Sequence, residues 1–208
     1  MTAAETTVLT PWDSPGPAVP RRGNAMTRGF SRLILRMAGW RVAGTMPDLP
    51  KFIIIAAPHT SNWDFPLGIL AKSAVGLRVS FFGKDSLFRG PLGWFMRWQG
   101  GKPVDRQAAH GVVAETIRIV RESPHFVLAI APEGTRKRVA AWKSGFYHLA
   151  HGAGIPIVPA HLDFGRHEVR FETPFWPTGD AEGDIATIRL GFRNTEARHP
   201  ALYDPGSP

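Results

Sequence analysis

The clearest structural pattern in this chain is the stretch Phe52-Ile53-Ile54-Ile55-Ala56-Ala57-Pro58-His59-Thr60-Ser61-Asn62-Trp63-Asp64. It begins with a β-branched apolar run, which is typical of a strand buried on both faces. Pro58 ends this run, and a polar cluster follows it directly. His59 therefore lies where a buried strand is expected to pass into a loop. A rigid scaffold often holds catalytic groups at such positions, so His59 is a candidate catalytic residue.

Asp64 follows five residues later and begins an apolar pattern with helical spacing. Five helical steps of about 100° would leave the two side chains roughly 140° apart around the helix. His59 and Asp64 can therefore meet only if His59 lies in a non-helical segment that folds back over the helix N-terminus. A second interpretation stays open, because Ser61–Asp64 also fits a capping box in which the carboxylate only caps the helix.

The composition is that of a globular protein with a basic surface. A chain of 208 residues fits one domain with a substantial core. It has no cysteine, which excludes disulfide scaffolds and thiolate metal sites and fits a reducing compartment. Lys and Arg number 25 against 17 Asp and Glu, so the formal net charge is +8. Such a charge favours an anionic partner, which can be a nucleic acid, an anionic lipid surface or a phosphorylated substrate.

The sequence predicts a terminal tail at each end of the chain. Residues 1–24 are rich in Thr, Pro, Ala and Gly and offer little to bury, so we expect disorder there. A Pro-rich tail is expected over 197–208. The N-terminus lacks the basic and apolar regions of a signal peptide. The longest apolar run is far shorter than the roughly 20 residues that a spanning helix needs, so we expect no transmembrane span.

Residues 27–42 have the pattern of a basic amphipathic helix. Arg28, Arg32 and Arg36 form a row at i, i+4 spacing. The apolar residues at helical spacing beside this row are Phe30, Leu33, Ile34, Met37 and Trp40. Such a helix can lie in a membrane interface, with its arginines on anionic headgroups. The equally open alternative is a surface helix that packs on the body of the domain.

Strands and helices alternate along the rest of the chain, which indicates one α/β domain over 25–196 with a mixed, partly parallel sheet flanked by helices. The prolines at 156 and 159 predict an edge strand or an irregular strand. Trp94 and Trp98 belong to a short apolar helix and are expected in the core, with a lipid-facing surface as the alternative. Strands are expected over 52–57, 78–83, 126–130, 155–160 and 169–171, and helices over 64–75, 91–98, 108–122, 143–152 and 184–193.

Four segments carry chemically informative residues in a fixed order, and each follows or forms an apolar strand. They are His59-x4-Asp64, Gly100–Arg106, Pro132–Arg136 and Ile155–Pro159. This set resembles the glycerolipid acyltransferase family, of the lysophosphatidic acid acyltransferase type, over roughly residues 50–165. The first and third segments together are highly specific, whereas the fourth is weak by itself. The resemblance implies a fold like that of glycerol-3-phosphate acyltransferase.

The resemblance also implies roles for individual residues. His59 would be the general base that takes the proton of an acceptor hydroxyl, and Asp64 would orient it and stabilise its imidazolium. The implied acceptor-phosphate residues are Arg106, Glu133, Gly134, Thr135 and Arg136. Arginine suits this role because its planar fork matches a phosphate. Taken singly, Glu133 with Arg136 also reads as a surface ion pair.

The expected reaction transfers a fatty acyl group from acyl-CoA or acyl carrier protein to a lysophospholipid such as 1-acyl-glycerol-3-phosphate. A lipid acceptor without glycerophosphate is the alternative. The reaction needs no cofactor and no metal. An anionic membrane surface is the expected partner, which places the protein in the cytoplasm, peripheral on the inner face of the membrane. The sequence departs from the family at Ala131, where an aromatic residue is usual, and at Trp63, where a smaller residue is usual.

Two other classes of function fit single features of the sequence. A nucleic-acid-binding module would explain the basic charge, but the sequence has no recognition motif and no basic residues interleaved with aromatic ones, so no nucleic-acid partner is expected. A metal-dependent hydrolase would use His59 and Asp64 as ligands. His148 and His151 share one helix face, but no carboxylate stands at a suitable spacing, so this class is disfavoured.

Overall fold

The computed structural model describes residues 6–9, 15–104 and 109–206. Within them, eight strands form one sheet in the order β1-β2-β8-β7-β3-β6-β4-β5. The pairs β1/β2 and β7/β8 are antiparallel, and the other neighbours are parallel, so the predicted mixed sheet is confirmed. The strands are β1 (Thr6–Leu9), β2 (Arg41–Pro47), β3 (Lys51–Ala57), β4 (Ser80–Lys84), β5 (Gly101–Val104), β6 (Phe126–Ile130), β7 (Ile157–Asp163) and β8 (Glu168–Phe171).

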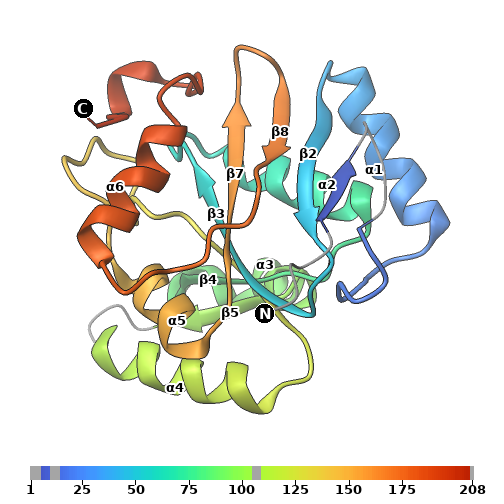
Figure 1. Cartoon of the computed structure of the whole chain (residues 1–208). Coiled ribbons are helices and arrows are strands. Elements are labelled where there is room, and N and C mark those ends of the chain that lie inside the picture. The colour runs from blue at the N-terminus through green and yellow to red at the C-terminus, as the bar shows by residue number, and fades with distance from the viewer. Residues whose placement is uncertain (1–5, 10–14, 105–108, 207–208) are drawn as a thin grey trace.

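Helices cover both faces of this sheet. Figure 1 shows α5 and α6 in front of it, α4 below α5 at the bottom of the view, α2 and α3 behind it, and α1 at its flank. The helices are α1 (Ala25–Met37), α2 (Asp64–Val75), α3 (Gly90–Trp98), α4 (Ala109–Glu122), α5 (Gly145–Ala153) and α6 (Ala181–Gly191), with 3-10 turns η1 (Asp85–Phe88) and η3 (Pro200–Leu202). The expected helices are present, and most of their ends differ by a few residues. The helix expected over 27–42 ends at Met37, however, and Arg41–Pro47 forms β2, a strand that the sequence did not predict.

Strand β3 joins two hydrophobic clusters, because its side chains alternate between the faces of the sheet. Phe52 and Ile54 pack in the cluster beneath α1 and α2. Ile53 and Ile55 pack in the cluster that includes residues of α5 and α6. All four side chains are buried, so the expectation of a strand covered on both faces is confirmed.

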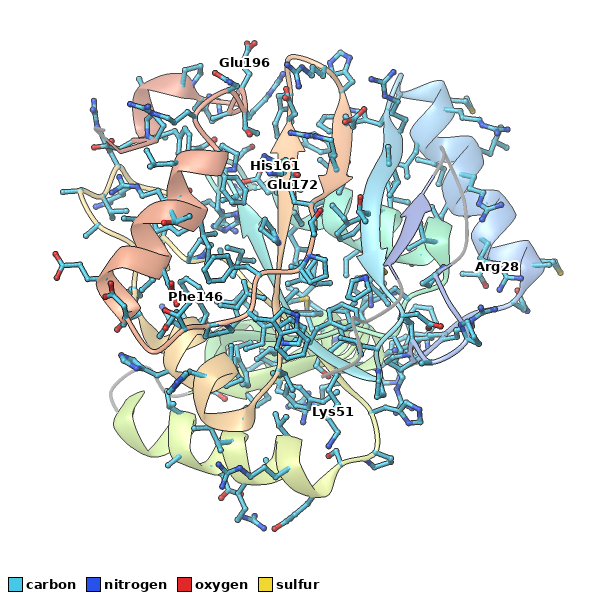
Figure 2. The ribbon with its side chains drawn as sticks, viewed as in Figure 1. Arg28, Lys51, Phe146, His161, Glu172 and Glu196 are labelled. Atoms are coloured by element: carbon cyan, nitrogen blue, oxygen red, sulfur yellow. The ribbon has the colours of Figure 1, made fainter. Side chains whose placement is uncertain are left out.

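The parallel strands β3, β6 and β4 bring their carboxyl ends to the same edge of the sheet. Ile55 pairs with Ile130, and Phe81 pairs with Ala129. The loops after these strands therefore leave the sheet together, although their residues are far apart in sequence. In Figure 2, Lys51 marks the lower end of the sheet, where β3 begins.

Strand β7 lies inside the sheet, between β3 and β8, so the prediction of an edge position is wrong. Ile157 pairs with Phe175, whereas Ala160 pairs with Phe171, so the facing segment contains one extra residue. Pro159 lies at this bulge. A proline can occupy an interior strand there, because the ladder hydrogen bonds are already interrupted.

The two segments expected as tails are partly built into the domain. Residues 6–9 form β1 on β2, and Val19 is buried, which differs from the disorder expected for 1–24. At the other end, Ala197 and Tyr203 pack in the cluster that includes residues of α5 and α6. The boundaries at 24 and 196 therefore do not separate ordered from unstructured chain.

Helix α1 begins at Asn24, whose side chain accepts a hydrogen bond from Thr27 N at 2.9 Å. Its arginine row does not simply face solvent, because Arg32 Nε donates to Ala74 O of α2 at 2.8 Å. Trp40 packs edge-on against a neighbouring ring and is only partly exposed. The apolar side chains on the outer side of α1 are Met26, Phe30, Leu33 and Met37.

Helix α3 presents aromatic residues to solvent. Trp94 is 68% exposed and Trp98 is 52% exposed, so the prediction that they belong to the core is wrong. Their rings stack with centroids 6.0 Å apart, and the guanidinium of Arg22 lies over Trp98 at 5.2 Å. Hydrophobic periodicity could not distinguish this exposed apolar face from a buried one.

Candidate active site

The loop between β3 and α2 holds His59 against Asp64. Helix α2 begins at Asp64, so His59 lies in the non-helical segment before it, as the sequence required. His59 Nδ1 lies 3.0 Å from Asp64 Oδ2. The same oxygen accepts a hydrogen bond from Ser61 N at 2.8 Å. Asp64 therefore holds both the imidazole and the main chain of the segment before the helix. The residue before the helix, Trp63, makes no side-chain capping hydrogen bond, so Asp64 does more than cap the helix.

This contact determines how the imidazole can act. With Nδ1–H donating to the Asp64 carboxylate, Nε2 of His59 is the nitrogen that can take up a proton. The His59 side chain is 21% exposed, whereas that of Asp64 is 1% exposed. A buried carboxylate behind a solvent-reaching imidazole is the arrangement that a general base requires.

Glu133 follows β6 and reaches the backbone of the same loop. Both carboxylate oxygens lie 3.0 Å from His59 N and accept its hydrogen bond. The side chain is buried, and this burial raises the pKa of Glu133 to about 7, although the hydrogen bond and charge of His59 oppose the shift. The resemblance implied a phosphate-binding role, yet Glu133 lines neither of the cavities next to His59.

Arg136 contacts the loop between β3 and α2 through only one of its guanidinium nitrogens. Its Nε donates to Ser61 O at 3.2 Å. Gly134 has a φ of +65°, a left-handed conformation that favours glycine, and an added Cβ there would lie 2.8 Å from Cε of Lys143, so that the lysine would have to move. Gly134, Thr135 and Arg136 all line the larger cavity. Arg106 falls outside the described residues, so its prediction is not tested.

The C-terminal segment also contacts the loop that holds His59. His199 N donates to the hydroxyl of the buried Thr60 at 3.2 Å. His161, on β7, contacts this segment through Nδ1, which lies 2.6 Å from the Thr195 hydroxyl. Burial lowers the pKa of His161 to about 4, so it stays neutral; Figure 2 shows it beside Glu172. No local sequence signal marks these contacts, because they join residues far apart in the chain.

A cavity of about 210 Å³ extends from His59 into the core between α2 and the sheet. Apart from His59, Asp64 and Lys72, its lining side chains are apolar or glycine. Burial and the charge of Arg22 lower the pKa of Lys72 to about 8, and its Nζ donates to Gln99 O at 2.5 Å. This cavity offers a hydrocarbon chain an apolar environment that begins at the imidazole.

A second, wider cavity of about 770 Å³ adjoins the first and shares His59 with it. The cationic side chains that line it are Lys84, Arg136, Lys137 and Lys143. Within the described part of the chain, none of the three lysines forms an ion pair, and no acidic residue lines this cavity. Ala131 lines both cavities, so the small side chain at this unusual position lies at their junction.

Among the residues that the structure describes, no three His, Cys, Asp or Glu side chains converge as a metal-binding group would. The described residues likewise contain no helix that is long and apolar enough to cross a membrane.

Comparison with known proteins agrees with this arrangement. The model of the family described as Acyltransferase matches residues 45–163, which is more than half of the chain and contains the His59 loop and the Glu133 loop. The chain belongs to the acyltransferase family. Within this acyltransferase, the His59–Asp64 pair and the loop from Pro132 to Arg136 thus fall inside the matched region.

Several similar proteins share one named activity. A 1-acyl-sn-glycerol-3-phosphate acyltransferase from Haemophilus influenzae is 29% identical over 150 residues, which cover 67% of this chain and 60% of the relative. The enzyme of that name from Escherichia coli is 31% identical over 113 residues, which cover 51% of this chain and 44% of the relative. The chain therefore spans only about half of these relatives' lengths. The resemblance to the lysophosphatidic acid acyltransferase type is confirmed at the level of the family.

A solved structure confirms the fold. The crystal structure of the 1-acyl-sn-glycerophosphate acyltransferase from Thermotoga maritima superposes with a TM-score of 0.54 and 19% identity. The match covers 83% of this chain and 80% of the other. At this identity the likeness supports the α/β architecture alone.

Proposed function

We propose that this acyltransferase moves a fatty acyl group from a thioester donor, acyl-CoA or acyl carrier protein, to the hydroxyl of 1-acyl-glycerol-3-phosphate in phospholipid synthesis. One observation carries the proposal: the His59 imidazole, held by Asp64, stands where an apolar cavity meets a basic one. An acyl chain and a phosphate need these two environments on opposite sides of one base.

The chemical step follows from the position of the imidazole. Nε2 of His59 takes the proton of the acceptor hydroxyl while its oxygen attacks the thioester carbonyl carbon. Asp64 stabilises the imidazolium that forms. The carbon–sulfur bond then breaks, and the thiolate takes the proton from His59. The products are an ester and a thiol, and the imidazole returns to its neutral form without a cofactor or a metal.

The basic cavity is assigned to the phosphate of the acceptor. Arg136 donates to Ser61 O through Nε, which orients its terminal nitrogens without using them. These nitrogens can bind a phosphate in a bidentate manner. Gly134 and Thr135 line the same cavity, and we assign Arg106 to the same phosphate on the basis of the family pattern. The lysines of the cavity favour the approach of a donor that also carries phosphate.

The acceptor is a membrane lipid, so the protein must reach an interface. We propose that it binds an anionic membrane surface peripherally, on the cytoplasmic face, through the outer sides of α1 and α3. The exposed side chains Phe30, Met37, Trp94 and Trp98 suit the headgroup boundary, where tryptophan is favoured. Arg22, which lies over Trp98, adds positive charge at the same place.

A thiol-release assay tests the proposal. Purified protein is given one acyl-CoA or one acyl carrier protein thioester with a panel of hydroxyl acceptors, and free thiol and acylated product are measured. We expect thiol release that depends on 1-acyl-glycerol-3-phosphate and on His59. Release with a lipid that lacks the phosphate would instead support the alternative acceptor. An absence of thiol release with every acceptor and both donors would contradict the proposal.

A further inference from the structure

Glu133 differs from its neighbours in where its side chain lies. Pro132, Gly134, Thr135 and Arg136 line the larger cavity, whereas Glu133 lines neither cavity. Only 5% of Glu133 is exposed. Its carboxylate therefore has no direct route to a phosphate in the basic cavity.

The carboxylate instead meets the backbone of the catalytic base. Its two oxygens share the N–H of His59, each at 3.0 Å. The ring of the same residue is held through Nδ1 by Asp64 at 3.0 Å. His59 is thus fixed at two points, one on its main chain and one on its side chain, by two carboxylates from different elements.

We propose that Glu133 is a positioning residue for the His59 base and not a ligand of the acceptor. The inference rests on the proposed function, because it concerns the base of that reaction. Glu133 holds the main chain of His59 in place after the end of β3, and Asp64 holds the orientation of the His59 ring. Together they hold Nε2 at the junction of the two cavities.

Electrostatics favour this assignment over phosphate binding. A carboxylate beside a phosphate dianion would repel it, and among the described residues no hydrogen bond or ion pair links Glu133 to the cations of the basic cavity. A backbone N–H, by contrast, is a suitable partner for a buried carboxylate. Protonation does not remove the contact, since a neutral carboxyl still has an acceptor oxygen for the His59 N–H. The hydrogen bond between Glu133 and the His59 N–H therefore persists at pH values below and above the Glu133 pKa of about 7.

The kinetic test separates positioning from binding. Glu133→Ala removes the anchor, and we expect kcat to fall by about 10²-fold, because small misplacements of a catalytic group have effects of that size. Glu133→Gln keeps one acceptor oxygen, and its loss should be about 10-fold. The KM for the acceptor should stay within about two-fold in both variants, since uniform binding is not removed. Glu182→Gln, on the exposed first turn of α6, is the matched control with unchanged kinetics.

A second measurement does not depend on activity. Hydrogen exchange of the His59 amide is followed in the wild type and in both variants, with the amides of β3 as an internal reference. We expect the His59 amide to exchange at least about 10-fold faster in Glu133→Ala, while the β3 amides keep their rates.

The two measurements distinguish the possible failures. A raised acceptor KM with normal kcat in either variant would overturn the inference, and so would an unchanged His59 exchange rate. If the wild type transfers no acyl group at all, the proposed function fails, whereas the exchange result still decides whether Glu133 anchors His59.

Discussion

The Nδ1 atom of His59 lies 3.0 Å from Oδ2 of Asp64, and that oxygen also accepts the hydrogen bond of Ser61 N. One carboxylate therefore ties the base to the first turn of α2. Rotation of the imidazole away from the cavities would break this contact and leave the buried Asp64 carboxylate without its imidazole partner, which is unfavourable.

Loss of either member should stop acyl transfer while the protein stays folded. General-base catalysis contributes about 10²–10⁴-fold, so His59→Ala should lower kcat by at least that factor. Asp64→Asn should be nearly as damaging, because the imidazolium loses its anionic partner. Initial rates and circular dichroism check both variants. Near-normal turnover by folded His59→Ala would show that another group is the base.

Arg136 should act on the acceptor. Arg136→Ala should raise the KM for a phosphorylated acceptor by about 10-fold, a typical value for a lost charged hydrogen bond. Slow hydrolysis of the donor without acceptor should change much less. Arg138→Ala is the matched control, because Arg138 lies outside both cavities, near Asp204. We expect Arg106→Ala to behave like Arg136→Ala. A raised donor KM with normal acceptor KM would reassign the phosphate site.

The apolar cavity should limit the length of the acyl chain. Gly68 of α2 lines this cavity, and an added Cβ would meet no atom within 4 Å. Gly68→Leu should therefore fill part of the space without strain. We expect kcat/KM for long-chain donors to fall by about 10-fold or more, with short-chain donors little affected. Gly191→Leu, in open space on α6, is the control. An unchanged chain-length preference would place the acyl chain elsewhere.

Vesicle binding should depend on the aromatic face of α3. Each basic residue near an anionic leaflet contributes about 1 kcal/mol, so the wild type should sediment with anionic vesicles at low salt and less at high salt. The double change Trp94→Ala with Trp98→Ala should weaken binding. Trp176→Ala, which removes an exposed tryptophan outside α1 and α3, should not. A wild type that ignores anionic vesicles at low salt would refute peripheral binding through this face.

Glu133 should make stability depend on pH. Burial raises its pKa from 4.5 to about 7, so the folded protein keeps a proton that the unfolded chain releases within this window. The stabilisation of the folded state by this proton is fully present below the Glu133 pKa of the unfolded chain. It is lost as the pH rises through the Glu133 pKa of the folded protein, which lowers the free energy of unfolding by on the order of 3 kcal/mol. Glu133→Gln cannot ionise, so its free energy of unfolding should rise relative to wild type as the pH rises through this window. Urea unfolding at several pH values measures this difference, and a constant difference would contradict the pKa.

Much of the site could be predicted because its motifs are short. The run from Phe52 to Ala57 is apolar without alternation, which by itself indicates a strand between two layers of helices. The polar residues after it must then lie at the end of that strand. The contact between His59 and Asp64 could also be predicted. Asp64 begins a helix five residues after His59, and the segment between them is not helical, so the two side chains can meet.

The sequence by itself determined the alternation of strands and helices from Lys51 onward, the meeting of His59 with Asp64, and the family. It could do so because periodicity and short spacings depend on neighbouring residues. It did not predict β1 or β2. Only the tertiary structure decided that Glu133 lies under His59, 74 positions away, and that His199 meets Thr60, 139 positions away. It also decided that Trp94 and Trp98 face outward. These features depend on which surfaces the folded sheet and its helices cover, and local patterns carry no information about that.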